Sequence, residues 1–87
     1  MNFRFATHAE EEIARRGIHR AVVEEVLRAP EETVPGIGGR MVFQSLRKFG
    51  GEKTYLVRVV VDERVSPPLV ITAYRTSRIA KYRRKAT

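Results

Sequence analysis

The residues best suited to chemistry lie near the end of the chain, in the segment TAYRTSRIAKYRRK that spans residues 72–85. This segment holds two tyrosines, three side chains with an aliphatic hydroxyl, and six Lys or Arg residues without a single acid. Guanidinium and ammonium groups bind phosphate oxygens, and tyrosine rings stack on nucleobases. The segment therefore predicts either a solvated basic end or a surface that handles nucleic acid.

Alternation along two expected strands brings a guanidinium, a hydroxyl and a phenol onto one face of a sheet. Successive side chains of a strand point to opposite faces. In the expected strands KTYLVRVVVDE and LVITAYR, this rule leaves Arg58, Thr72 and Tyr74 on an uncovered face. The inward positions are Tyr55, Val57, Val59 and Val61 in the first strand, and Leu69, Ile71 and Ala73 in the second. The three polar groups could hold a phosphate; alternatively, Tyr74 closes an edge of the core and Arg58 lies over apolar neighbours.

A basic helix is expected after these strands, over the sequence RIAKYRRK. Arg78, Lys81 and Lys85 recur at spacings that place them on one side of a helix. Thr76 or Ser77 would cap its N-terminus, where free backbone amides offer a site for a phosphate oxygen. We therefore expect this helix to flank the sheet face with phosphate-binding groups.

His8 is the remaining candidate for proton transfer. Its position near the start of the first expected helix allows a general base, a phosphate donor, or a structural partner of a neighbouring carboxylate. His19 follows eleven positions later without cysteines or a carboxylate pattern, which does not predict a metal site. The segment GIGGR lacks the Lys-Ser/Thr ending of a nucleotide loop. We expect neither a metal nor a cofactor.

Two helices and a sheet are expected to position these residues. Thr7 and Glu10 have the spacing of a capping box, and a helix from His8 to about Arg16 would stop at Gly17. A second helix would open at Ile18 and His19 and end at Pro30, after which EETVPGIGG reads as a turn-rich link. Strands are then expected from Arg40 to Phe49, after the Gly50-Gly51 turn, and after RVSPP. The sum predicts an α+β fold, with two N-terminal helices on a three- or four-stranded antiparallel meander and a short C-terminal helix.

Length and charge bound the class of protein. A chain of 87 residues predicts one domain over residues 1–87, and a core this small without cysteine makes a stabilising partner a reasonable expectation. Residues 1–39 carry five Lys or Arg against seven acids, a balance of −2, whereas residues 40–87 carry twelve against three, a balance of +9. Such a field attracts phosphate backbones or anionic lipid, although ordinary solubility charge remains an alternative. A polar N-terminus and the lack of a long apolar run predict a cytoplasmic protein without a membrane partner.

The strings HAEEEIARRGI, VVEEVLRAPEE, GRMVFQSLR, TYLVRVVVDE and ITAYRTSRIAKY resemble a bacterial family, domain of unknown function 4258, from about Phe5 to Tyr82. More distantly, this family resembles small ribonuclease toxins of the RelE, ParE and BrnT types. The resemblance implies a RelE-like fold, an acidic antitoxin as partner, and a polar set of His8, Arg40, Arg58, Tyr74, Thr76 and Lys81. The chain departs from the family pattern at Glu12, His19 and Arg83.

The leading hypothesis is a metal-independent endoribonuclease of a toxin and antitoxin pair, acting on RNA that is free or on the ribosome. Arg58 and Arg40 would stabilise charge on the phosphate, and His8 or Tyr74 would transfer protons. The expected substrate-binding residues are Thr72, Arg75, Thr76, Ser77, Arg78, Lys81 and Lys85. The alternatives are a non-catalytic RNA- or DNA-binding module and a protein-interaction module of the same fold.

Overall fold

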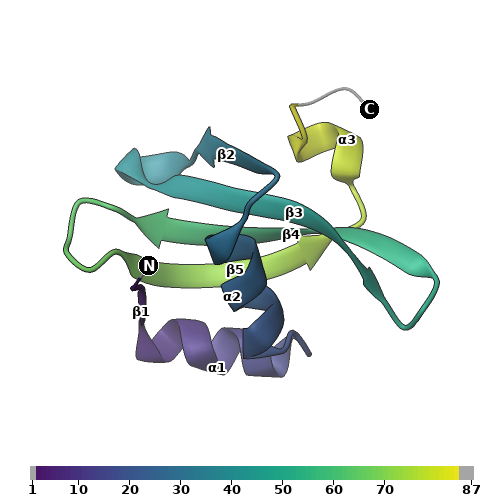
Figure 1. Cartoon of the computed structure of the whole chain (residues 1–87), viewed down its shortest axis with the longest axis horizontal. Helices are drawn as coiled ribbons and strands as arrows, with labels where there is room; N and C mark the ends of the chain where they lie inside the picture. Colours follow the sequence, from purple (N-terminus) through teal and green to yellow (C-terminus); the bar gives the residue numbers. More distant parts are fainter. Residues whose placement is uncertain (1, 85–87) are drawn as a thin grey trace.

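The computed structural model describes residues 2–84 and shows a central sheet with helices on both faces (Figure 1). Two helices precede most of the sheet in the chain, and one short helix follows it. In chain order the elements are β1 (Arg4–Phe5), α1 (Thr7–Arg15), α2 (Arg20–Arg28), β2 (Glu32–Pro35), a 3-10 turn (Ile37–Gly39), β3 (Met41–Phe49), β4 (Lys53–Asp62), β5 (Leu69–Thr76) and α3 (Ile79–Tyr82). The α+β class is therefore as expected.

The sheet is larger than the expected meander and is mixed rather than antiparallel. Its strand order is β1-β5-β4-β3-β2, with β1 parallel to β5 and the other neighbours antiparallel. The segment expected to be a turn-rich link instead forms β2, because Val34 is buried opposite Val42 and the glycine-rich turn behind it returns the chain directly into β3. A two-residue strand at the N-terminus supplies the parallel edge. The β3, β4 and β5 meander is confirmed, including the turn at Gly50-Gly51.

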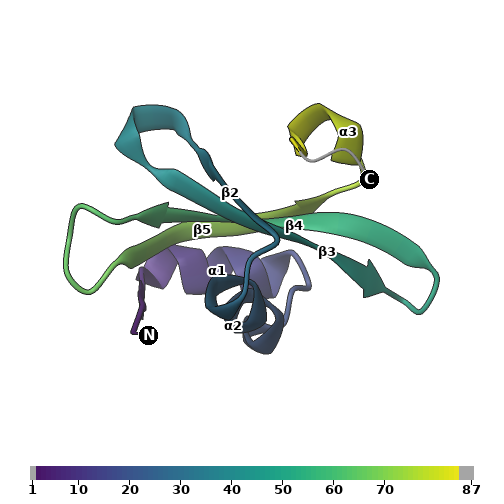
Figure 2. The ribbon, with the colours of Figure 1, turned by 45° about the horizontal axis from the view of Figure 1, so that its top comes forward.

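Helices α1 and α2 lie on one face of the sheet (Figure 2). Their buried residues are Ala9 and Ile13 in α1 and Val23, Val26 and Leu27 in α2. These side chains pack with Phe43, Val57, Val59, Val61, Val70 and Ala73 of the sheet to form the main core. The helices hold their place through this shared apolar layer, since removing such surface from water is the main source of folding free energy.

The end of α1 is the clearest case in which a single residue determines local structure. Gly17 has a φ of +69°, and its N–H donates to Ala14 O at 3.1 Å. The N–H of Ile18 donates to Ile13 O at 2.9 Å, which completes the paired hydrogen bonds typical of a helix stopped by glycine. Ile18 and Ile13 are both buried in the main core. The predicted stop at Gly17 is confirmed.

The helix starts differ from expectation. Ala6 is the N-cap of α1, so Thr7 is already helical and its side chain makes no capping hydrogen bond. In α2, His19 is the N-cap and the first helical residue is Arg20. Both caps have the extended backbone that is usual at an N-cap, and neither makes a side-chain capping hydrogen bond.

A bulge in β5 changes which residues face the helices. Val60 pairs with Thr72 but Val61 pairs with Val70, so Ile71 is an extra residue in β5. As a result Val70 and Ala73 are both fully buried in the main core. The predicted inward set of Leu69, Ile71 and Ala73 is therefore wrong for its first two members, since a bulge breaks strict alternation.

Helix α3 lies on the opposite face, which we call the second face (Figure 2). It is a single turn from Ile79 to Tyr82, shorter than the helix expected over 78–85. The second face is therefore not uncovered, and Val42, Gln44, Leu56 and Arg58 are buried on it. Lys85 lies outside the described residues. Among residues 2–84, no helix is long and apolar enough to cross a membrane.

Candidate functional site

Three polar side chains form a row across the second face. The register pairs Gln44 of β3 with Arg58 of β4, and Arg58 with Tyr74 of β5. The Arg58 Nε donates to Gln44 Oε1 at 2.8 Å, and Nη1 donates to the Tyr74 hydroxyl at 2.5 Å. With Tyr82, these residues form what we call the Arg58 cluster. Arg58 and Tyr74 are brought together as the sequence predicts.

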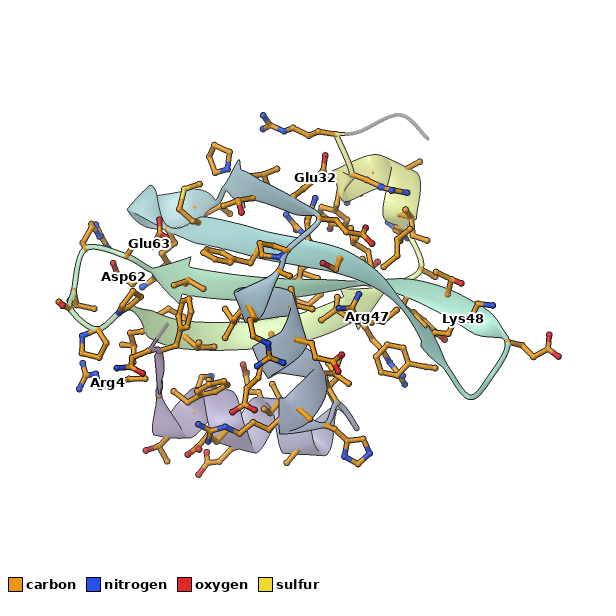
Figure 3. The ribbon with its side chains drawn as sticks, in the orientation of Figure 1. Arg4, Glu32, Arg47, Lys48, Asp62 and Glu63 are labelled. Carbon is orange, nitrogen blue, oxygen red and sulfur yellow. The ribbon has the colours of Figure 1, made fainter. Side chains whose placement is uncertain are left out.

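Helix α3 is docked on this row through Tyr82. The Arg58 guanidinium carbon lies 4.2 Å from the centre of the Tyr82 ring, a cation–π distance. The Gln44 Nε2 donates to Tyr82 O at 3.2 Å and to Glu32 Oε1 at 2.8 Å. The amide of Gln44 therefore links β2, β3 and the C-terminal turn, and Figure 3 shows Glu32 beside α3.

Access to the Arg58 guanidinium is narrow. Gln44 is fully buried and Arg58 is 9% exposed. Burying a guanidinium is costly unless it is hydrogen-bonded, and Nε and Nη1 both have partners. The third nitrogen, Nη2, has no hydrogen-bond partner among the described residues and is not among their buried unpaired atoms, so it reaches solvent. One anion oxygen could be bound there, beside the half-buried Tyr74 hydroxyl.

The rim of the Arg58 cluster is basic. Arg78 and Lys81 are exposed, and neither forms an ion pair with a described residue. The Arg78 N–H donates to the Thr76 hydroxyl at 3.0 Å. The predicted phosphate site on free amides at Thr76 and Ser77 is therefore not formed as expected, because Thr76 occupies the amide of Arg78 and α3 has only one turn. Ser77 itself is exposed.

His8 and Arg40 are not part of the Arg58 cluster. His8 is on α1, which the sheet separates from Arg58, and its Nε2 lies 3.0 Å from a Glu12 oxygen (Figure 2). Arg40 precedes β3, four residues before Gln44, a separation of roughly 13 Å along a strand. It lies near Asp62, whose pKa it helps to lower. The four predicted catalytic residues therefore occupy three separate places.

Neither Thr72 nor Arg75 takes part in the Arg58 cluster. The Thr72 hydroxyl donates to Glu12 and accepts from Arg16 Nη1 at 3.1 Å, so it belongs to the contact between α1 and the edge of β5. Arg75 lies on the helix side of the sheet, against Phe49 and Tyr55. Thr72 pairs with Val60, two residues from the pair of Arg58 and Tyr74, but α1 engages its hydroxyl, so the predicted phosphate-binding group of three is reduced to Arg58 and Tyr74.

Glu12 is the centre of the contact between α1 and β5. The hydrogen bond from Thr72 holds the pKa of Glu12 below its usual range; burial opposes this effect, and the positive charges of Arg16, His8 and Arg15 add to it. At the far end of the sheet, hydrogen bonds from Arg64 lower the pKa of Asp62 in the same way. Both carboxylates stay ionised through contacts that are already satisfied within the protein. Among residues 2–84 there is no group of three His, Asp or Glu side chains that could hold a metal ion.

Residues 5–75 match the model of a protein family described as Domain of unknown function (DUF4258). The chain belongs to this family. The match includes Gln44, Arg58 and Tyr74 but ends before α3, so Tyr82 lies beyond the matched residues. No curated protein and no solved structure matches the chain significantly.

The sequence did not predict that Gln44 and Tyr82 belong to the Arg58 cluster. Gln44 is an amide within an otherwise apolar stretch, MVFQSL, which is a signal that a buried polar group needs a partner. Its partner could not be read from the sequence, because the register of β3 and β4 decides it. The contact of Tyr82 with Arg58 depends on how the last turn folds back onto the sheet.

Proposed function

We propose that this protein is a small RNA-binding module. The observation that carries the proposal is the distribution of cationic side chains that form no ion pair with a carboxylate of the described residues. Most of them gather around α3 and the hairpin between β3 and β4, which we call the cationic end. Its members are Lys48, Lys53, Arg58, Arg75, Arg78, Lys81 and Arg84, whereas Arg4, Arg28 and Arg40 lie elsewhere.

Unpaired cations on one side of a small protein favour a polyanionic ligand. Neutralising phosphates releases condensed counterions, and this term is independent of sequence. At the cationic end the cations come with tyrosines and with the Arg58 Nη2, groups that suit stacking and phosphate binding. A non-catalytic role is favoured over catalysis because His8 and Arg40 are remote from Arg58 and Tyr74.

The test is binding of a labelled single-stranded RNA over a range of salt concentrations. Each phosphate contact to a single strand contributes about 0.7 to the log-log slope, so Arg78→Gln combined with Lys81→Gln should flatten the slope by about 1.4. Arg4→Gln combined with Arg28→Gln is the matched control, because it removes the same charge from unpaired arginines outside the cationic end. A salt-independent affinity, or equal losses in both double variants, would contradict the proposal.

A second candidate is the metal-independent endoribonuclease of a RelE-like toxin. The hydrogen bond between Arg58 Nη1 and the Tyr74 hydroxyl supports it, since it holds a phenol and a guanidinium at one point. In such a reaction the 2′-hydroxyl would attack the phosphorus and lose its proton to water as the bond to the 5′-oxygen breaks. Tyr74 would donate a proton to the leaving 5′-oxygen and regain one from water, and Arg58 would stabilise charge on the phosphate. His8 and Arg40 would take no part.

Cleavage is tested by incubating the protein with labelled RNA in excess chelator and analysing the products for cyclic-phosphate ends. Tyr74→Phe should abolish cleavage if the phenol transfers a proton. Tyr82→Phe is the control, because the contacts of Tyr82 use its ring and its carbonyl oxygen. Intact RNA with salt-sensitive binding favours the binding module, whereas cleavage that survives in Tyr74→Phe contradicts this assignment.

An acidic protein partner fits the same surface. In a toxin and antitoxin pair, a negatively charged antitoxin segment would cover the cationic end and compete with RNA. Co-expression with an acidic product of the neighbouring reading frame, followed by purification, tests this idea. A stable complex that no longer binds RNA supports a shared surface.

A further inference from the structure

We infer that the hairpin between β3 and β4 carries a stacking site for an unpaired base of single-stranded RNA, formed by Arg75 on Phe49 and Tyr55. We call these three residues the hairpin stack. The inference rests on the proposed RNA binding and adds to it a second kind of contact, made to bases rather than to phosphates. It also gives a role to Arg75, which the Arg58 cluster does not use.

Strand register brings the hairpin stack together on the helix side of the sheet. Phe49 pairs with Lys53, Arg47 pairs with Tyr55, and Val57 pairs with Arg75. All of these odd-numbered residues share one face, because alternate residues of paired strands point the same way. The hairpin extends beyond α1 and α2 (Figure 1), so these helices do not cover its tip.

The rings hold the Arg75 guanidinium in a defined position. Its central carbon lies 4.3 Å from the centre of the Phe49 ring and 4.8 Å from that of Tyr55. The two rings meet edge to face, with centres 5.5 Å apart. A planar cation fixed in this way has little freedom left to lose when a ligand stacks on it.

The aromatic rings position the Arg75 guanidinium, but its N–H donors are left without hydrogen-bond acceptors among the described residues. Among the described residues it has no hydrogen-bond acceptor and no carboxylate partner, and none of its nitrogens is a buried unpaired atom. Arg20 provides the contrast, since its guanidinium lies 3.9 Å from the Phe5 ring centre but also pairs with Glu10 and Glu24. The Arg20 contact is complete within the fold, whereas Arg75 keeps its donors for a ligand.

The surroundings favour a nucleobase with its flanking phosphates. Single-stranded RNA is recognised by stacking bases on aromatic rings and on guanidinium planes, with cations along the backbone. The Lys53 ammonium lies 5.5 Å from the Tyr55 ring centre, and Lys48 is exposed on the other face of the hairpin. Figure 3 shows Arg47 and Lys48 on β3 near the hairpin, far from the acidic Asp62 and Glu63. Arg47 pairs with Glu25 at 3.5 Å, so Lys48 and Lys53 are the cations left for phosphates.

The decisive experiment compares two ligands of equal length and charge, an oligouridylate and an abasic ribose-phosphate oligomer. If bases stack on Arg75, the wild-type protein should bind the oligouridylate about tenfold more tightly, as expected for one stacked base. Arg75→Lys keeps the charge but loses the planar surface, and should remove this difference while leaving the affinity for the abasic oligomer unchanged. Arg20→Lys is the matched control and should preserve the tenfold preference.

A Tyr55→Leu variant provides an independent check on the same site, with thermal unfolding used to show that each variant is folded. Equal, salt-sensitive affinity of the wild-type protein for both oligomers would overturn the stacking site and leave the proposed function intact. Binding of neither oligomer would overturn both. A preference that persists in Arg75→Lys and in Tyr55→Leu would place base recognition elsewhere and overturn the assignment to the hairpin stack.

Discussion

Two regions of the molecule, the helices α1 and α2 and the cationic end, use their charges in different ways. On the helices, Arg20 pairs with Glu10 and Glu24, and Glu12 contacts His8, Arg15 and Arg16. At the cationic end, none of the seven side chains forms an ion pair with a described carboxylate, although the backbone N–H of Arg84 donates to Glu32. Clustered like charges repel, which costs stability unless a ligand neutralises them. The difference teaches that charge pairing, more than charge itself, separates a structural surface from a candidate binding surface.

The largest expected effect concerns the buried centre of the second face. Arg58→Ala leaves Gln44 Oε1 without its donor and removes the packing beneath Tyr82. We expect a loss of about 3 kcal/mol in the free energy of unfolding, measured by urea denaturation. Arg78→Ala, at an exposed position on the same side, should change stability by less than about 0.5 kcal/mol. A loss in Arg58→Ala as small as that expected for Arg78→Ala would mean that the Arg58 cluster contributes little to stability.

Neutralising the hairpin cations tests the comparison directly. Lys48→Gln combined with Lys53→Gln should weaken RNA binding about tenfold, or about 1.4 kcal/mol. Unfolding stability should stay the same or rise slightly, since unpaired like charges are removed. Arg15→Gln combined with Arg16→Gln removes equal charge from paired arginines at the end of α1 and should leave RNA affinity unchanged. A loss of affinity in this control would erase the distinction between the two regions.

A paired arginine on the helix side should matter for stability and not for binding. Arg20→Ala removes half-exposed ion pairs with Glu10 and Glu24 and the cation–π contact with Phe5. We expect a loss of about 1 kcal/mol in unfolding free energy. Arg28→Ala, in the last turn of α2 and without a carboxylate partner among the described residues, serves as the control and should cost less.

The smallest expected effect is a change in acid stability. Because the folded-state pKa of Glu12 is lowered, chiefly by the hydrogen bond from Thr72, its stabilising contribution is present above the unfolded pKa of about 4.3 and is lost as pH falls. Thr72→Val should raise the pKa of Glu12 toward its usual value, as observed by NMR titration of the carboxyl group. The variant should be less stable than wild type near neutral pH, with the difference shrinking below about pH 4. An unchanged Glu12 pKa would show that the cations, not Thr72, hold the carboxylate ionised.

Local sequence signals predicted much of the fold, and long-range pairing explains the rest. Gly17 stops α1 because only a residue that tolerates positive φ fits there. Strand β2 was missed because its four residues lie among Pro and Gly, and only pairing with β3 stabilises them. For the site, the presence of Arg58 and Tyr74 on one sheet face was predicted, whereas their direct pairing, the roles of Gln44 and Tyr82 and the separate location of His8 were not.

The sequence by itself determined the order of the main helices and strands, the stop at Gly17 and the basic character of residues 40–87, since each follows from local conformational preference or composition. Only the tertiary structure decided which side chains meet. A three-residue loop, 50–52, pairs Phe49 with Lys53 and so places Arg58 opposite Gln44. A two-residue loop of Gly50 and Gly51 would shift the register by one and place Arg58 opposite Phe43. The bulge at Ile71 likewise turns Val70 into the main core while Tyr74 stays beside Arg58. Register and bulges shift whole faces by single residues, and they are selected by the packing of both faces together rather than by any one segment.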